Sequence, residues 1–214
     1  MEVINSRLVS WASILDDKTR EQALITARLS IIYPHLALMP DAHLGLGATV
    51  GSVIPTLGAV IPAAVGVDIG CGMIAVRTQY AVKDLPTDRK RLREGIEHAI
   101  PLSAGHYNHR ITATAAPRID QLRRMAAAAR FDPGQYAPNW TLQLGSLGSG
   151  NHFIEVCADE ADAVWLFLHS GSRGVGNKLA QRHIGEARSM SRSRHIALPH
   201  PDLAYLEEGT PEFD

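Results

Sequence analysis

The chain has 214 residues, a length that suits one large domain or two small ones. Its 21 Lys and Arg nearly balance its 22 Asp and Glu, and 45% of its residues are hydrophobic, which argues against a disordered tail and against a uniformly basic nucleic-acid coat protein. Seventeen of the basic residues are Arg and ten residues are His, so the composition favours a site that handles phosphate.

The first part of the chain changes from a helical pattern to a strand pattern. Good helix formers between Thr19 and Leu29, with Thr19 and Gln22 at the spacing of a capping box, predict a first helix. Short Val, Ile and Leu runs interrupted by Gly and Pro follow from Leu36 to Thr78. These runs predict short buried strands joined by tight turns.

Helices and strands mix in the remainder of the chain. A loop is expected over residues 103–116, between two helical segments. The predicted helices cover Pro86–Ile100, Pro117–Arg130 and Gly174–Met190, and the predicted strands cover Trp140–Leu144, His152–Cys157 and Ala163–His169. We therefore expect an α+β fold of mixed short strands and helices.

The cysteine count and the first residues bear on the compartment. Two cysteines, Cys71 and Cys157, are too few for a disulfide framework, so we expect a reducing environment. The first residues lack the charged and apolar regions of a signal peptide, and the apolar stretches are shorter than a membrane span. We expect a cytoplasmic protein with no membrane partner.

A glycine-bounded turn from Asp68 to Gly72 holds a carboxylate and a thiol three residues apart. The flanking glycines let the backbone bend so that Asp68 and Cys71 converge. A turn aspartate that caps backbone amides beside a buried cysteine is the alternative interpretation.

Two histidines occupy junctions between predicted strands and glycine-rich loops. His152 follows the run 145–151, and His169 ends the run 164–168. With Asp68 and Cys71 they form a plausible metal-binding set of a thiolate, a carboxylate and two imidazoles, although a lone His in either place is more often a structural residue. These ligand types suit zinc, manganese, iron or cobalt, and a thiolate can bridge two metals that clamp the oxygens of a phosphoryl transfer.

The glycine loops also suit an anion. Residues 145–150 have the first spacing of a P-loop, but Asn151 and His152 replace its Lys and Ser/Thr, which excludes Walker-type nucleotide binding. Exposed amides and the Asn151 side chain still suit phosphate. Small residues next to Arg173 in the segment 169–174 are typical of a phosphate site, whereas the elbow of a serine nucleophile is absent.

Two further features carry less specific signals. The segment 173–194 has six basic residues and one acid, Glu186, which indicates either a solvated helix face or an RNA-phosphate surface built from Arg173, Lys178, Arg182 and Arg188. Asp41 and His43 pair an acid with an imidazole near the end of a strand, where a capped turn is the alternative.

Four segments in order resemble the motifs of the RtcB-type RNA ligases, which join 3′-phosphate and 5′-hydroxyl ends. They are Met39–His43, Gly66–Met73, Gly145–Phe153 and His169–Gly174. The resemblance covers nearly the whole chain, and it implies the N-terminal part of the RtcB-type ligase fold.

The resemblance implies an enzyme of RNA splicing and repair that depends on manganese and GTP. In this scheme a His is guanylylated, GMP passes to an RNA 3′-phosphate or 2′,3′-cyclic phosphate end, and the 5′-hydroxyl end attacks. The implied metal ligands are Asp68, Cys71, His152 and His169, with Cys71 shared by two manganese ions. The implied contacts to the guanine nucleotide are Asn151, His152, Phe153, Ile154 and Glu155, and Asp41 is an implied site acid.

The resemblance also implies that residues 1–214 form a single, incomplete ligase domain. RtcB-type ligases continue well beyond the matching region, and no His here matches the guanylylated one. We therefore expect an N-terminal portion whose activity needs a complementing C-terminal half. A non-catalytic remnant that binds RNA and metal is the alternative, and an unrelated metallohydrolase is a more distant one.

Overall fold

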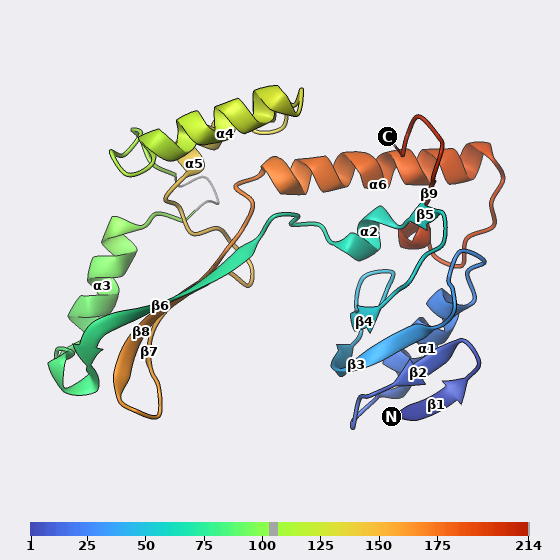
Figure 1. Ribbon diagram of the computed structural model, residues 1–214, viewed down its shortest axis with the longest axis horizontal. Coiled ribbons are helices and arrows are strands. Elements are labelled where there is room, and N and C mark those ends of the chain that lie inside the picture. Colours follow the sequence, from blue (N-terminus) through green and yellow to red (C-terminus); the bar gives the residue numbers. More distant parts are fainter. Residues whose placement is uncertain (103–106, 214) are drawn as a thin grey trace. The chain divides into compact units, whose positions relative to one another are not determined.

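The computed structural model describes residues 1–102 and 107–213, which form two compact units (Figure 1). Unit 1 contains residues 1–67 and the segment from Ala180 onward, and unit 2 contains Asp68–Leu179. Both units mix helices with sheets, so the predicted α+β class is confirmed. The prediction of one domain over the whole chain stays a prediction.

Unit 1 begins with a four-stranded sheet of order β1-β2-β3-β4. Strands β2 and β3 are parallel and the other neighbours are antiparallel. Leu8, Leu36 and Leu38 of the sheet are fully buried against Ala23 and Ala27 of helix α1, which forms one core. These elements are β1 (Glu2–Asn5), β2 (Leu8–Ser10), α1 (Asp17–Ala27), β3 (Leu36–His43) and β4 (Val50–Val53).

Helix α1 starts two residues before the predicted start, and the predicted capping box is wrong. Asp16 is the N-cap, and its carboxylate accepts hydrogen bonds from the amides of Lys18 and Thr19 at 3.0 Å each. Thr19 is buried and donates its hydroxyl to Asp16, while the Gln22 side chain bonds the backbone of Gly45. An aspartate upstream therefore takes the capping role that the spacing of Thr19 and Gln22 had suggested.

The second part of unit 1 pairs two short strands that lie far apart in the sequence. Strand β5 is antiparallel to β9, and Ala204 and Leu206 pack against the C-terminal part of α6. Leu203 belongs to a separate core cluster with Leu29, Ile32 and Ile61. These elements are β5 (Ala59–Val60), α2 (Pro62–Val65), α6 (Val175–Ser193), η3 (Pro201–Leu203) and β9 (Leu206–Glu207), and the first residues of α6 belong to unit 2.

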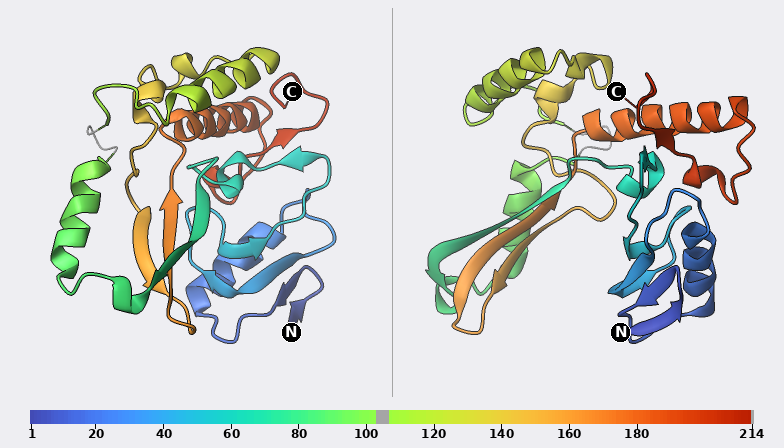
Figure 2. Two further views of the ribbon diagram at one scale, coloured as in Figure 1. Left: turned by 60° about the vertical axis from the view of Figure 1, so that its left-hand side comes forward. Right: turned by 45° about the vertical axis from the view of Figure 1, so that its right-hand side comes forward.

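Unit 2 is built on an antiparallel sheet of order β6-β8-β7. Helix α3 lies along one face of this sheet, as the views in Figure 2 show, and a cavity of about 670 Å³ lies between its Leu92 and Ile96 and the strand residues Ile154 and Val156. The elements are β6 (Gly72–Ala81), η1 (Val82–Asp84), α3 (Arg89–Ala99), α4 (Ala116–Ala128), η2 (Pro133–Gln135), α5 (Trp140–Gln143), β7 (Phe153–Ala158) and β8 (Ala163–Ser170).

The short buried strands expected over Leu36–Thr78 are only partly confirmed, since β6 is ten residues long and most of its residues are exposed. After Thr78 most predicted elements are confirmed, and one is wrong. Helices α3, α4 and α6 and strands β7 and β8 lie where the patterns predicted them. The predicted strand Trp140–Leu144 is instead the short helix α5, because the amides of Leu142 and Gln143 turn back to bond the Asn139 carbonyl. Of the loop expected over 103–116, residues 103–106 lie outside the described residues. In the described part of the chain, no helix has the length and apolar character to span a membrane.

Candidate functional site

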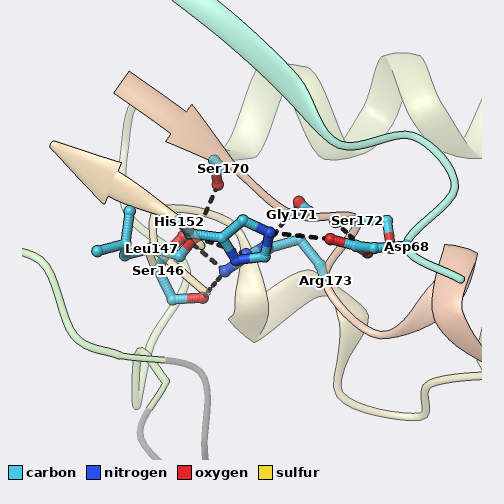
Figure 3. A network of polar contacts seen from close by, with 8 residues as sticks. All are labelled: Asp68, Ser146, Leu147, His152, Ser170, Gly171, Ser172 and Arg173. Carbon is cyan, nitrogen blue, oxygen red and sulfur yellow. Dashed lines mark hydrogen bonds and ion pairs between the residues drawn. The ribbon is translucent and has the colours of Figure 1, made fainter. Parts of the chain in front are cut away.

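The antiparallel register of the unit 2 sheet gathers three motifs at one end. Gly72 at the start of β6 pairs with Ser170 at the end of β8, and His169 pairs with both Met73 and Phe153. The turn that contains Asp68 leads into β6, and the loop that contains His152 leads into β7. The sheet therefore brings Asp68, His152 and the segment after His169 together (Figure 3).

Two groups hold the Asp68 carboxylate in place. Its Oδ2 lies 2.9 Å from His152 Nε2, and its Oδ1 accepts hydrogen bonds from the Ser172 amide at 3.1 Å and from the Ser172 hydroxyl. Burial raises the pKa of Asp68, but the hydrogen bonds from Ser172 and the contact with His152 outweigh burial and hold that pKa below its usual value. Asp68 is therefore an oriented carboxylate anion at neutral pH.

The His152 side chain is largely enclosed, since it is only 9% exposed. Its ring meets the His169 ring edge to face, with 5.2 Å between the centroids. Its Nδ1 is buried and has no hydrogen-bond partner among the described residues. An imidazole nitrogen without a partner in a polar site is suited to a ligand, because burying it alone carries a cost.

Two glycines let the loops close around His152. A Cβ on Gly148, whose φ is +110°, would lie 2.1 Å from His152 Nδ1. A Cβ on Gly171 would lie 2.3 Å from His152 Cε1 and 2.6 Å from Asp68 Oδ2. Glycine at both positions is thus a steric requirement of the Asp68–His152 contact.

Arg173 joins the two glycine loops. Its Nη1 donates to the carbonyl and the hydroxyl of Ser146 at 2.6 Å each, its Nη2 donates to the Leu147 carbonyl at 2.7 Å, and its Nε donates to the Gly171 carbonyl at 3.1 Å. Ser170 reinforces the junction by donating its hydroxyl to the same Leu147 carbonyl at 2.9 Å. Burial lowers the pKa of Arg173 and the Asp68 charge partly offsets this, yet a guanidinium stays protonated.

A polar cavity of about 370 Å³ opens beside these groups. Asp68, His152, Asn151 and Arg173 line it together with Ser172 and the glycines of both loops. An oriented carboxylate, an imidazole, a carboxamide and a guanidinium around one small cavity suit a phosphate group or a metal ion.

The structure brings the predicted metal ligands together only in part. Asp68 meets His152, and His152 meets His169, while the Cys71 thiol is exposed in the turn that follows Asp68. Within residues 1–102 and 107–213, no group of three or more His, Cys, Asp or Glu has the spacing to hold a metal ion. The donor types and the partnerless His152 Nδ1 fit a transition metal. Because the structure does not bring three of these ligands together, the metal site stays a prediction.

The other predicted residues lie in different surroundings. Asn151 lines the cavity, but alternation along β7 turns Phe153 and Glu155 to one face of the sheet and Ile154 to the other. Asp41 lies in β3 of unit 1, where its carbonyl contacts His43 Nδ1 at 2.6 Å. On α6, Lys178 is exposed, Arg182 pairs with Glu186 at 2.9 Å, and Arg188 pairs with Asp202.

Sequence reasoning did not single out Ser172 or Ser146. Ser172 orients Asp68, and Ser146 is the principal acceptor for Arg173. Both are in segments that the motifs had marked, but their roles depend on contacts across 27 to 104 residues of sequence.

Comparison with known proteins places these motifs in a family. The chain is 45% identical to the RNA-splicing ligase RtcB of Escherichia coli K12 over 91% of its own length and 50% of that protein. It is 30% identical to the tRNA-splicing ligase RtcB of Thermococcus kodakarensis over 92% of its length, and 29% identical to that of Methanococcus maripaludis over 93%. The chain spans about half the length of these curated relatives.

The family model described as tRNA-splicing ligase RtcB matches residues 22–214. This range contains all four motifs and the whole of unit 2. The chain therefore belongs to the tRNA-splicing ligase RtcB family, as its motifs predicted.

Proposed function

We propose that this chain supplies the Asp68–His152 half of an RNA ligase site that joins 3′-phosphate or 2′,3′-cyclic phosphate ends to 5′-hydroxyl ends. The observation that carries the proposal is the Asp68–His152 pair, fixed by Ser172 and enclosed by two glycine loops that Arg173 joins. Family membership supports the choice of RNA as the substrate class.

Each residue of the site has a separate task in this proposal. Ser172 orients the Asp68 carboxylate, and Asp68 in turn sets the orientation of the His152 ring. Arg173 holds the loop that carries Asn151 against the segment 171–173, so that the cavity has fixed walls. A phosphate in this cavity meets the Asn151 carboxamide and backbone amides of the glycine loops.

Manganese is the proposed metal, and Asp68, Cys71, His152 and His169 are the residues that would hold it. When bound, manganese would supply Lewis-acid stabilisation of charge on phosphoryl oxygens. The mixed donor set of thiol, carboxylate and imidazole supports a transition metal over magnesium, which prefers oxygen ligands alone.

GTP is the proposed cosubstrate, contacted from this chain by Asn151 and by the start of β7. Phe153 and Glu155 share one face of that strand and are the better placed to contact one ligand, whereas Ile154 lines the cavity beneath α3. No residue among 1–214 matches the guanylylated His of the family scheme, so the proposed reaction also requires residues outside this range.

Complementation tests the proposal. The 214-residue chain, mixed with a separately expressed C-terminal half of the E. coli relative, is expected to join two RNA oligonucleotides in the presence of manganese and GTP. The matched variant Asp68→Asn keeps the side-chain volume and removes the charge, and it is expected to lower the ligation rate at least 100-fold. A mixture that binds RNA and manganese but never ligates would support the non-catalytic alternative and contradict this proposal.

A further inference from the structure

A second cavity of about 540 Å³ lies against the 171–173 segment. Gly171, Ser172 and Arg173 line both this cavity and the polar cavity of the candidate site. Its volume is within the range of about 300–1,000 Å³ that is usual for small-ligand sites. The two cavities therefore share a wall that is three residues long.

The far wall of this cavity is one face of helix α4. Leu122, Met125, Ala126 and Ala129 recur at the helical spacing and line it. Leu122 is 41% exposed and Met125 is 59% exposed, so this face has no complete cover within the described residues.

Aromatic rings complete the cavity. Trp140 of α5 and Phe131 line it, and Phe131 stacks on Tyr136 with 5.3 Å between centroids and 20° between planes. Phe131 reaches this position because Arg130 adopts a left-handed conformation with φ 52°, and the Phe131 amide turns back to bond the Ala126 carbonyl at 2.9 Å. The cavity thus offers flat apolar surfaces between small alanine side chains.

The helix that forms the far wall of the cavity is basic. Helix α4 and the residue after its C-cap carry Arg118, Arg123, Arg124 and Arg130 against a single acid, Asp120. Asp120 pairs with Arg123 at 3.5 Å, and neither Arg124 nor Arg130 makes an ion pair within the described parts of the chain. Arg173 is the arginine among the residues that line the cavity, whereas Arg124 lies on the opposite side of α4 from Leu122 and Ala126. An apolar cavity with aromatic walls that adjoins a polar, phosphate-sized cavity suits a ligand that joins a flat ring to a phosphate.

We infer that this cavity binds a nucleobase of the RNA end whose phosphate occupies the neighbouring polar cavity. This inference rests on the proposed function and adds a base subsite to it. Stacking on aromatic side chains accepts any base, because every base has a π face, so the subsite contributes affinity with little sequence preference.

Two alanine substitutions on the same helix test the subsite. Ala126→Leu fills the cavity, whereas Ala128→Leu adds the same atoms at an exposed position outside it. The probe is an RNA tetranucleotide with a 3′-phosphate, compared with a tetranucleotide that lacks the base of its last residue. Dissociation constants are measured by calorimetry on the 214-residue chain.

Wild type and Ala128→Leu are expected to bind the complete oligonucleotide about tenfold more tightly than the abasic one. Ala126→Leu is expected to bind both with the weaker affinity. If wild type binds the two oligonucleotides equally, the subsite is overturned and the proposed function stands. This comparison uses wild type alone, so it does not depend on the folding of any variant. Binding of neither oligonucleotide overturns the subsite together with the RNA-binding part of the proposed function. A wild-type dimer that Ala126→Leu dissociates in sedimentation would assign the cavity to a second copy and overturn the inference.

Discussion

Replacing Arg173 with Lys tests whether this residue joins the two glycine loops. The guanidinium reaches acceptors on Ser146, Leu147 and Gly171 from three nitrogens. A lysine ammonium donates all its hydrogen bonds from one nitrogen, so it cannot reach the acceptors that the three guanidinium nitrogens reach. If two hydrogen bonds from a charged donor are lost at about 1.5 kcal/mol each, the free energy of unfolding falls by about 3 kcal/mol.

The assay is urea unfolding of the chain, followed by tryptophan fluorescence, to which Trp140 and Trp165 of unit 2 and Trp11 of unit 1 contribute. Arg182→Lys is the matched control, because Arg182 makes an ion pair with Glu186 on an exposed helix surface and such pairs contribute about 0.5 kcal/mol. Equal midpoints for Arg173→Lys and Arg182→Lys would refute the role of Arg173 as the link between the loops.

Three further predictions concern the metal, the basic helix and a helix cap. Cys71→Ala is expected to weaken manganese binding more than Cys157→Ala in a manganese titration, and equal titration curves would contradict the ligand assignment. Lys178→Gln is expected to reduce the slope of log affinity for RNA against log salt by about one unit, whereas an unchanged slope would favour a merely solvated helix face. Asp16→Ala is expected to lower stability at pH 7. Hydrogen bonds from Thr19 lower the pKa of Asp16 in the folded state. The stabilisation by this cap is therefore complete well above pH 3.8, the ordinary pKa of the group, and is lost as the pH falls through the folded pKa. Chemical denaturation of both proteins across this range measures the difference, and a gap that stays constant down to pH 2 would argue against the cap.

The elements that the sequence predicted well are those with local signals. Asp88 caps α3 and accepts hydrogen bonds from the amides of Lys90 and Arg91, and the pattern around it had indicated the start of this helix. Strands β1 and β2 had no such signal, since β2 is fixed by parallel pairing with β3 more than 20 residues away. The segment 140–144 is too short for its hydrophobic pattern to separate a strand from a helix.

In the candidate site too, the sequence predicted the residues with local signals but not the contacts between distant segments. Motif spacing marked Asp68, His152 and Arg173, because glycine-rich turns beside polar residues are visible in the sequence. The pairing of Asp68 with His152, and of Arg173 with Ser146, depends on the strand register of the sheet, which no local pattern encodes. The role of Arg173 in joining loops therefore emerged only from the structure.

Transfer of label from GTP tests the central claim most directly. We expect no covalent guanylylated species when the 214-residue chain is incubated alone with labelled GTP and manganese, because a covalent intermediate needs a nucleophile and the implied one is absent. Addition of the C-terminal half of the E. coli relative is expected to give a label on that half, and Asp68→Asn in this chain is expected to reduce it. A label that survives denaturation and maps to a histidine of the 214-residue chain would contradict the account.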